Sequence, residues 1–495
     1  MARIDAAPPS LRRARIPLAI AAIILVIAVV ALALFLLFGK PGGDPNTAGP
    51  NDIAIEYATE GGKGAKEGIV NSPLRVSVRI PWSDGSQQNA IGSVMVQIVD
   101  EAGNPAEFGG TVPDPFLMKP TFDIAVWDYA TSIPSKPGTY HARVQVQKLS
   151  ESEPVQTLDL REPTIQAKPE PGLPLTSGYV FASDYNLWVL STDTTRQRRL
   201  TYFPPVYEYA DTPAWSPDGK QIAFTYSPPT DPSETPATEI WAIAPGQSGP
   251  VQLVAHAPGE SLYEPAWSPD GKYLYFTAES LDVNATMFDA SGIPVNTRRI
   301  DRVELQTGIR SEWMPLAQMP GAGGVGNLLA FLEYAPPAAD DPAATAKQRL
   351  VSTNLDGSDK KTLIDENAFQ LMYAPSISPD GKWVVFAAIN VPPTPIQDGG
   401  SFDFFKWLFF QPEIAHAHGL PWDVYAVPTA GGTPVRLTTL DEDQPYPTWL
   451  DNSTVAFMGI TGLYKINLKP DGQPAGDPMK VHPGAPHGGL TWHAP

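Results

Sequence analysis

The sequence predicts an all-β protein, in which a six-bladed β-propeller follows a small β-sandwich and a single N-terminal transmembrane helix. Three observations lead to this fold class. A twelve-residue phrase recurs at intervals of roughly fifty residues, the region before it alternates apolar and polar residues, and a long uncharged run lies near the N-terminus.

The recurring phrase has the pattern of a β-hairpin. An apolar "PAW" segment is followed by Ser-Pro-Asp-Gly, a turn in which Pro fixes φ and Gly is free to take a positive φ. A β-branched and aromatic run such as "KQIAF" then has the character of a strand. The copies are Pro213–Phe224, Pro265–Phe276, Pro375–Phe386 and a more divergent Pro447–Phe457. In the first copy two more strand signals follow, so each unit provides the four strands of one propeller blade.

The phenylalanine that ends the second strand counts the blades. It occurs in six copies: Phe181, Phe224, Phe276, Phe331, Phe386 and Phe457. The first copy has no preceding first-strand phrase, whereas "GGLTWHAP" (Gly488–Pro495) is a first-strand phrase with nothing after it. We therefore expect the C-terminus to pair with Gly178–Leu190 and to close the ring, which removes exposed sheet edges.

The fourth copy has lost its Ser-Pro-Asp-Gly turn, and "GAGGVG" (Gly321–Gly326) stands there instead. These glycines satisfy G-x-G-x-x-G, but a dinucleotide site needs a strand before them and a helix after them. Here a strand-like run follows, so we interpret the glycines as a turn and expect no cofactor.

The N-terminal run Ile16–Phe38 has 23 residues without a charge, about 34 Å as a helix, enough to span a bilayer. Because Arg12, Arg13 and Arg15 precede it, residues 1–15 should be cytoplasmic and everything after Lys40 outside. A cleaved signal peptide is the alternative, but it has a shorter apolar core and an A-x-A-like exit. We expect an uncleaved anchor in the cell membrane, followed by a Gly- and Pro-rich linker at 39–50.

Residues 51–165 are expected to form the sandwich. Leu74–Ile80, Ser93–Val99 and Thr139–Gln147 alternate apolar and polar residues, which is typical of a small antiparallel sandwich. The segment "KPGTYHARVQV" resembles the penultimate strand of immunoglobulin-like modules. A Pro-rich linker at 166–177 then leads to the propeller at 178–495.

Composition narrows the function. The net charge of −19 disfavours a nucleic-acid backbone as partner, and the absence of cysteine excludes disulfides, thiolate metal sites and cysteine nucleophiles. No G-x-S-x-G elbow, H-E-x-x-H or EF-hand motif occurs. His416 and His418 have a metal-like spacing, but a metal site usually needs three convergent ligands. We therefore expect no catalytic, cofactor-binding or metal-binding residues.

Acidic residues and tyrosines gather just before the first strand of several blades. If those loops precede the innermost strand, they ring one mouth of the central channel. They could be ordinary solvated loops, or they could form an acidic, aromatic-edged mouth for a basic peptide or protein partner. The candidate residues are Tyr207, Glu208, Asp211, Tyr263, Glu264, Tyr373, Asp441, Glu442, Asp443 and Tyr446.

An insertion in the fifth blade contains "SFDFFKWLFFQP" (Ser401–Pro412). Its apolar residues spread around nearly the whole of a helical turn, so the segment must pack on the propeller, on a partner or at a membrane interface. Phe404, Trp407 and Phe410 are the candidate contacts with a partner or membrane.

The Ser-Pro-Asp-Gly phrases, the later strand "LWVL", "IWAI" or "DVYAV", and the closing "RLT" (Arg199–Thr201, Arg436–Thr438) resemble the TolB-type propeller repeat over Gly178–Pro495. The resemblance implies a docking platform whose channel mouth holds a protein or peptide. We expect a membrane-anchored extracytoplasmic scaffold rather than an enzyme. A carbohydrate- or cell-wall-binding module is the alternative, and an enzyme that acts inside the channel is a third possibility.

Overall fold

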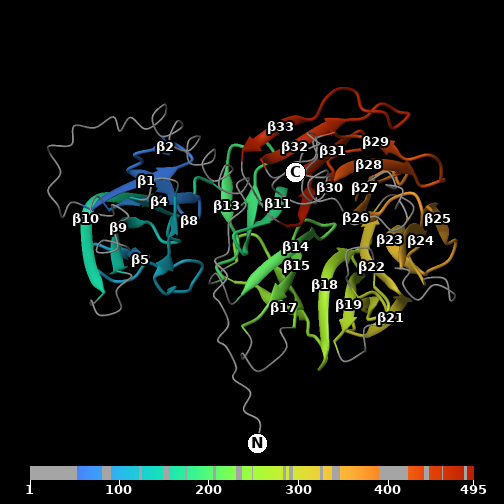
Figure 1. Cartoon of the computed structure of the whole chain (residues 1–495), viewed down its shortest axis with the longest axis horizontal. Coiled ribbons are helices and arrows are strands. Elements are labelled where there is room, and N and C mark those ends of the chain that lie inside the picture. The colour runs from blue at the N-terminus through green and yellow to red at the C-terminus, as the bar shows by residue number, and fades with distance from the viewer. Residues whose placement is uncertain are drawn as a thin grey trace, which may run out of the picture. The chain divides into compact units, whose positions relative to one another are not determined.

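The chain is shown in Figure 1 as a computed structural model. The residues that the structure describes are 53–80, 91–121, 125–148, 155–172, 175–203, 208–229, 237–247, 249–281, 286–288, 294–323, 327–336, 346–389, 422–439, 445–459, 461–483 and 488–495. The expected cytoplasmic tail, transmembrane helix and first linker lie outside these residues. Within the described part of the chain, no helix is long and apolar enough to cross a bilayer.

Two five-stranded sheets come first along the chain. The first has the order β2-β1-β4-β8-β7 and the second β3-β10-β9-β5-β6. The strands of the first are β1 (Ala54–Thr59), β2 (Gly62–Lys63), β4 (Pro73–Arg79), β7 (Lys119–Pro120) and β8 (Val126–Ser132). Those of the second are β3 (Glu67–Ile69), β5 (Ile91–Asp100), β6 (Phe116–Leu117), β9 (Gly138–Lys148) and β10 (Gln156–Lys168).

Alternating burial explains these strands. In β4 the side chains of Leu74, Val76 and Val78 are buried, while Arg75 and Arg79 are exposed. Successive side chains of a strand point to opposite faces, so each sheet presents one apolar face to a core, as in a sandwich. The three predicted strands are confirmed as β4, β5 and β9. The last strand, β10, ends at Lys168 and so includes the first three residues of the expected second linker.

Six four-stranded antiparallel sheets follow within the described residues. The first contains β11 (Gly178–Ser183), β12 (Asn186–Leu190), β13 (Gln197–Arg199) and β34 (Leu490–His493). The second contains β14 (Tyr209–Trp215), β15 (Ile222–Ser227), β16 (Glu239–Ile243) and β17 (Val251–Val254). The third contains β18 (Glu260–Trp267), β19 (Tyr273–Ser280), β20 (Arg298–Glu304) and β21 (Arg310–Pro315).

The other three sheets repeat the same up-and-down order. The fourth contains β22 (Ala317–Gly323), β23 (Leu328–Ala335), β24 (Lys347–Asn354) and β25 (Lys361–Ile364). The fifth contains β26 (Leu371–Ile377), β27 (Trp383–Ile389), β28 (Asp423–Pro428) and β29 (Val435–Arg436). The sixth contains β30 (Tyr446–Trp449), β31 (Thr454–Gly459), β32 (Gly462–Asn467) and β33 (Met479–Pro483).

The first of the six sheets is built from both ends of this region. Strand β34 pairs antiparallel with β11, with Trp492 opposite Tyr179 and Leu490 opposite Phe181. Successive sheets contact one another through their first strands, and β34 contacts both β14 and β30. The six sheets therefore form a closed, propeller-like ring, and the predicted pairing of the C-terminus with Gly178–Leu190 is confirmed (Figure 1).

The Ser-Pro-Asp-Gly phrase folds as a tight turn between the first and second strands. In the second sheet the Ser216 hydroxyl lies 2.8 Å from Asp218 Oδ1, and that carboxylate accepts a hydrogen bond from the backbone N–H of Lys220 at 3.1 Å. Gly219 takes a φ of 67°, a left-handed conformation that favours glycine. The same serine–aspartate pair recurs at Ser268–Asp270 and Ser378–Asp380.

The strand that follows each turn is the apolar centre of its sheet. Five of the phenylalanines that count the blades are completely buried: Phe224, Phe276, Phe331, Phe386 and Phe457. Fully burying one such side chain contributes roughly 1.5–3 kcal/mol. The repeat in the sequence is therefore a repeat of core contacts.

The interpretation of "GAGGVG" as a turn is wrong for its first three residues. Gly321, Ala322 and Gly323 lie in β22, the first strand of the fourth sheet. Pairing of Gly321 with Ala330 places them at the "AW" position of the repeat instead of at its turn. A Cβ at Gly321 would lie 2.0 Å from the backbone oxygen of Pro375 in the next sheet, so this position requires glycine for close packing.

Candidate binding channel

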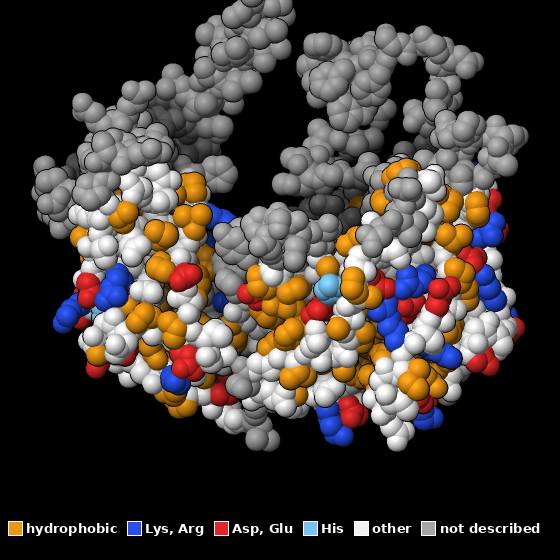
Figure 2. Space-filling view, turned by 90° about the horizontal axis from the view of Figure 1, so that it is seen from below, with side chains coloured by type: hydrophobic (Ala, Val, Ile, Leu, Met, Phe, Trp, Pro, Cys, Tyr) orange, Lys and Arg blue, Asp and Glu red, His pale blue; other side chains and the backbone are white. Residues whose placement is uncertain are grey.

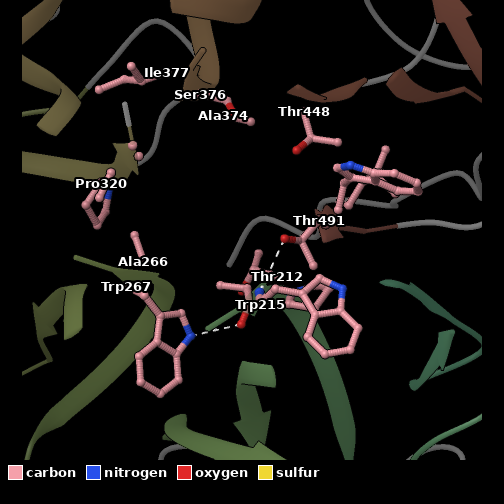
Figure 3. Close-up of a pocket in the computed structure, with 18 of the residues that line it drawn as sticks. Thr212, Trp215, Ala266, Trp267, Pro320, Ala374, Ser376, Ile377, Thr448 and Thr491 are labelled. Carbon is pink, nitrogen blue, oxygen red and sulfur yellow. Dashed lines mark hydrogen bonds between the residues drawn. The ribbon is translucent and has the colours of Figure 1, made fainter. Parts of the chain in front are cut away.

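A cavity of about 600 Å³ lies where the first strands of all six sheets meet. Its wall consists of residues from β14, β18, β22, β26 and β30 and from the C-terminal segment that contains β34 (Figure 3). Ligand sites typically have volumes of roughly 300–1,000 Å³. We refer to this cavity as the channel.

One level of the channel wall is formed by the residue that precedes proline in the repeat. Four of these residues have a left-handed backbone although none is glycine: Thr212 (φ 45°), Glu264 (φ 57°), Met319 (φ 55°) and Ala374 (φ 48°). In each of the four strands the pairing register shifts at this place, as in a β-bulge. Bulges redirect side chains and are common beside binding sites. Tyr446 occupies the corresponding position in β30, and Gly489, directly before β34, occupies it in the C-terminal segment.

The next level of the wall has two chemically different sides. On one side lie the small residues Ala214, Ala266 and Gly321, and on the other lie the hydroxyl residues Ser376, Thr448 and Thr491. Figure 3 shows Ala266 and Pro320 across the channel from Thr448 and Thr491. We call these two sides the small-residue side and the hydroxyl side.

Tryptophans of the repeat join neighbouring sheets at this wall. The indole nitrogen of Trp267 donates a 2.9 Å hydrogen bond to the backbone oxygen of Ala214 in the preceding sheet (Figure 3). Trp449 makes the same bond to the oxygen of Ser376 at 3.1 Å. The indoles therefore fix the spacing of the sheets around the channel.

The acidic candidates Asp211 and Glu264 lie within strands and not in loops before them. Asp211 Oδ1 accepts hydrogen bonds from the backbone N–H of Gly489 at 2.9 Å and of Thr212 at 2.6 Å. Glu264 Oε2 accepts hydrogen bonds from the Thr277 hydroxyl at 2.6 Å and from the Met319 N–H at 3.1 Å. Each carboxylate thus connects its own sheet to an adjacent one.

The surroundings of both carboxylates are poorly solvated. Burial raises the pKa of the Asp211 carboxyl and that of the Glu264 carboxyl, although their hydrogen bonds act in the opposite direction. Glu264 lines the channel directly, whereas Asp211 lies behind its wall. The acidic character of the channel is therefore smaller than the sequence suggests.

Two tyrosine candidates form a pair inside the channel. The hydroxyl oxygens of Tyr373 and Tyr446 lie 2.7 Å apart, and their rings meet edge to face with centroids 5.1 Å apart. Burial raises the pKa of both phenols, so they remain neutral hydrogen-bonding groups at ordinary pH.

The remaining candidates lie elsewhere. Glu208 accepts a 2.7 Å hydrogen bond from the Tyr226 hydroxyl, and Tyr263 is half-buried in β18; neither lines the channel. Outside the described residues lie Tyr207, Asp441, Glu442, Asp443, Phe404, Trp407 and Phe410.

The sequence analysis missed the hydroxyl side. Thr448 is 8 % exposed, and within the described part of the chain its hydroxyl makes no hydrogen bond. In Figure 3 this hydroxyl points into the channel. The repeat places Ser376, Thr448 and Thr491 at one equivalent position, directly after Pro375, Pro447 and Leu490, but the sequence does not indicate that this position lines the channel.

No metal site is evident in the described ranges, where no three His, Asp or Glu side chains are grouped as ligands. On the face of the molecule in Figure 2, acidic and basic side chains are interspersed with hydrophobic ones. The net charge of −19 is therefore not concentrated on that face.

Comparisons with known proteins identify only distant matches. No protein-family model matches the chain, and no curated protein matches it. A protein described as TolB from Agrobacterium tumefaciens matches with 19% identity over 59% of this chain and 86% of its own, with a TM-score of 0.36. An oligogalacturonate lyase from Vibrio parahaemolyticus matches with 13% identity over 58% and 71%, with a TM-score of 0.35.

The tricorn protease matches with 10% identity over 81% of this chain and 43% of its own, with a TM-score of 0.34. These neighbours include enzymes and a protein described as TolB, and the similarity concerns the fold alone. The chain is a distant structural match to TolB-like and tricorn-type β-propellers.

Proposed function

We propose that the protein is a membrane-anchored extracytoplasmic binding protein whose channel holds a segment of a partner protein. The observation that carries this proposal is the channel itself. Its wall has residues from all six sheets, is more apolar than polar, and carries its polar groups at defined positions such as the hydroxyl side. This combination is typical of binding sites, in which apolar walls supply affinity and a few polar groups fix orientation.

The free edges of the first strands favour an extended peptide. Each of these strands has a partner on one side only, so part of its backbone faces the channel. Side chains satisfy some of these groups; for example, the Trp215 N–H donates to the Thr491 hydroxyl at 3.3 Å. An extended segment can hydrogen-bond to the remaining ones, as in strand addition.

A carbohydrate is the alternative ligand. Sugars stack on open aromatic faces, but three of the four indoles that line the channel are largely covered: Trp215 is 7 % exposed, Trp267 9 % and Trp449 5 %, while Trp492 is half-buried. For this reason we favour a peptide segment. The proposed activity is binding rather than catalysis.

The remaining parts of the chain have supporting roles in this proposal. Ile16–Phe38 anchors the protein in the membrane with its N-terminus in the cytoplasm, and the two five-stranded sheets form an immunoglobulin-like spacer. A reporter fused after Pro495 should then be active only outside the cytoplasm, and the mature protein should retain Met1–Phe38. N-terminal sequencing that begins near Gly39 would instead show a cleaved signal and a released protein.

Photo-crosslinking in native membranes tests the binding site. A photoreactive amino acid at Ser376, on the hydroxyl side, should capture one defined protein, whereas the same group at Val251, exposed on β17, should not. Ala214→Leu, which narrows the channel, should abolish the capture. Equal capture from both positions, or capture that survives the narrowing, would contradict a partner in the channel.

A further inference from the structure

The charges that line the channel are few and of one sign. Among the described lining residues, Glu264 is the single carboxylate, His493 is the single histidine, and no lysine or arginine is present. The guanidinium of Arg298 acts electrostatically on Glu264, but it donates to Glu279 at 3.2 Å and to Gln318 and does not line the channel. The channel therefore offers a ligand one carboxyl group and no lysine or arginine.

The carboxylate of Glu264 has one occupied and one available oxygen. Oε2 accepts two hydrogen bonds, from Thr277 and Met319. Oε1 accepts none from any residue in the described ranges. A guanidinium binds best to both oxygens of a carboxylate in a fork, whereas an ammonium is a compact charge that needs one.

A second, independent group points into the same space. The Thr448 residue is 8 % exposed, its hydroxyl has no hydrogen-bond partner within the described residues, and that hydroxyl is directed into the channel (Figure 3). A hydroxyl at a cavity wall without a protein partner is available as an acceptor to a ligand that enters the cavity. Tyr446 lies two residues before Thr448 on β30, and its pair with Tyr373 of β26 adds phenol oxygens that can accept further hydrogen bonds.

The small-residue side suits an unbranched apolar stem. Ala214, Ala266 and Gly321 leave space along the wall opposite the hydroxyl side. An ammonium carries three N–H donors and no acceptor, which matches a carboxylate oxygen and hydroxyl oxygens offered as acceptors. Both the charge and the hydrogen-bonding groups thus fit the same chemical group.

We propose that the channel binds a primary ammonium group, carried on an apolar stem, through Glu264 and Thr448. The group belongs to a lysine side chain or to the amino terminus of the bound segment. This inference rests on the proposed function, since it names the chemistry of the segment that the channel holds.

Calorimetric titration of the full-length protein in detergent tests it with three pentapeptides. Ac-Gly-Gly-Lys-Gly-Gly-amide carries only a side-chain ammonium, the norleucine counterpart has the same stem without charge, and Gly-Gly-Nle-Gly-Gly-amide carries only a terminal ammonium. At least one ammonium peptide should bind about tenfold or more tightly than the neutral one. The ammonium peptide that binds shows whether the channel binds a lysine side chain or an amino terminus.

Point variants distinguish a loss of ammonium binding from a loss of folding. Glu264→Gln should remove the preference for ammonium, and Glu312→Gln, exposed on β21 of the same sheet, should leave it unchanged. Because Glu264 also holds Met319, Thr448→Val provides a second variant that leaves those bonds intact; it should weaken ammonium binding several-fold without affecting the neutral peptide. Melting temperatures should show that Thr448→Val is folded.

Three results would overturn the inference in different ways. If neutral and charged peptides bind equally and Ala214→Leu blocks both, the channel binds peptides without reading an ammonium, and only the inference fails. If no peptide binds and crosslinking from Ser376 also fails, the proposed function fails with it. If no peptide binds but crosslinking from Ser376 succeeds, the channel holds a partner without recognising an ammonium group, and the inference fails.

Discussion

Asp211 Oδ1 lies 2.9 Å from the backbone nitrogen of Gly489, a residue 278 positions later in the chain. This hydrogen bond joins the second sheet to the segment that completes the first one. The bond lies directly before β34, the strand that closes the ring. Asp211, which the sequence analysis assigns to a binding loop, therefore has a structural role.

Removal of Asp211 should therefore weaken closure. Asp211→Ala leaves the N–H groups of Thr212 and Gly489 without an acceptor and should lower the free energy of unfolding by about 1–3 kcal/mol. Asp211→Asn keeps an acceptor oxygen and should be milder. Chemical denaturation of the three proteins measures the difference, and equal losses in the two variants would show that the acceptor is unimportant.

The difference in stability between the parent protein and Asp211→Asn should depend on pH. Burial raises the pKa of Asp211 in the folded state above its usual value of 3.8. Its contribution to stability is then complete below that value and declines as the pH rises through the raised pKa. Asp211→Asn removes this decline, so its stability relative to the parent should improve from about pH 4 upward. A constant difference between the two proteins over this range would contradict the raised pKa.

Deleting Leu490–Pro495 should open the ring. The deletion removes β34, including the pair between Trp492 and Tyr179, and exposes an edge of β11. We expect a sharply lower melting temperature by circular dichroism. Deleting only Ala494 and Pro495, which are exposed beyond β34, is the control and should change little. An unchanged melting temperature in the longer truncation would defeat the closure.

Loss of an indole between sheets should cost more than loss of one within a sheet. Trp267→Phe removes the donor to the Ala214 oxygen and leaves a small cavity, which should lower stability by about 2 kcal/mol. Trp241→Phe is the control, because its indole donates to Glu239 of the same strand at 2.7 Å. Similar losses of stability in both variants would mean that the hydrogen bond between sheets contributes no more than one within a sheet.

Asp218 of the Ser-Pro-Asp-Gly turn should contribute to the loss of stability at acidic pH. Hydrogen bonds with Lys220 and Ser216 lower the pKa of Asp218 to about 2 from 3.8. Its contribution is present above the unfolded value and is lost as the pH falls from about 4 toward 2. Asp218→Asn should lose less stability over that interval in urea titrations. A parallel curve for the variant would contradict this assignment.

How much of this molecule could be predicted depends on the range of the interaction. Proline, glycine and strand-forming residues act within a few positions, so the blades and their turns follow from the repeat. Ring closure followed because Gly488–Pro495 is a first-strand phrase without a second strand.

The channel chemistry could be predicted only in part. Glu264, Tyr373 and Tyr446 were among the candidates and do line the channel. Their partners are distant in sequence, however: Tyr373 meets Tyr446 73 residues later, and Glu264 binds Met319 55 residues later. No local pattern indicates that an acid bonds to the next sheet. The left-handed residue before proline was missed for a related reason, since isolated X-Pro sequences favour extended backbone.

The first sheet also orders events in time. Residues 178–199 are synthesised long before residues 490–493, yet the two segments share one sheet. Until β34 is made, β11 has an unpaired edge that can associate with another chain. The ring is therefore completed only after the other strands of the six sheets have been made, and a product terminated before residue 490 lacks β34. A quality-control protease that recognises open sheet edges would distinguish the two.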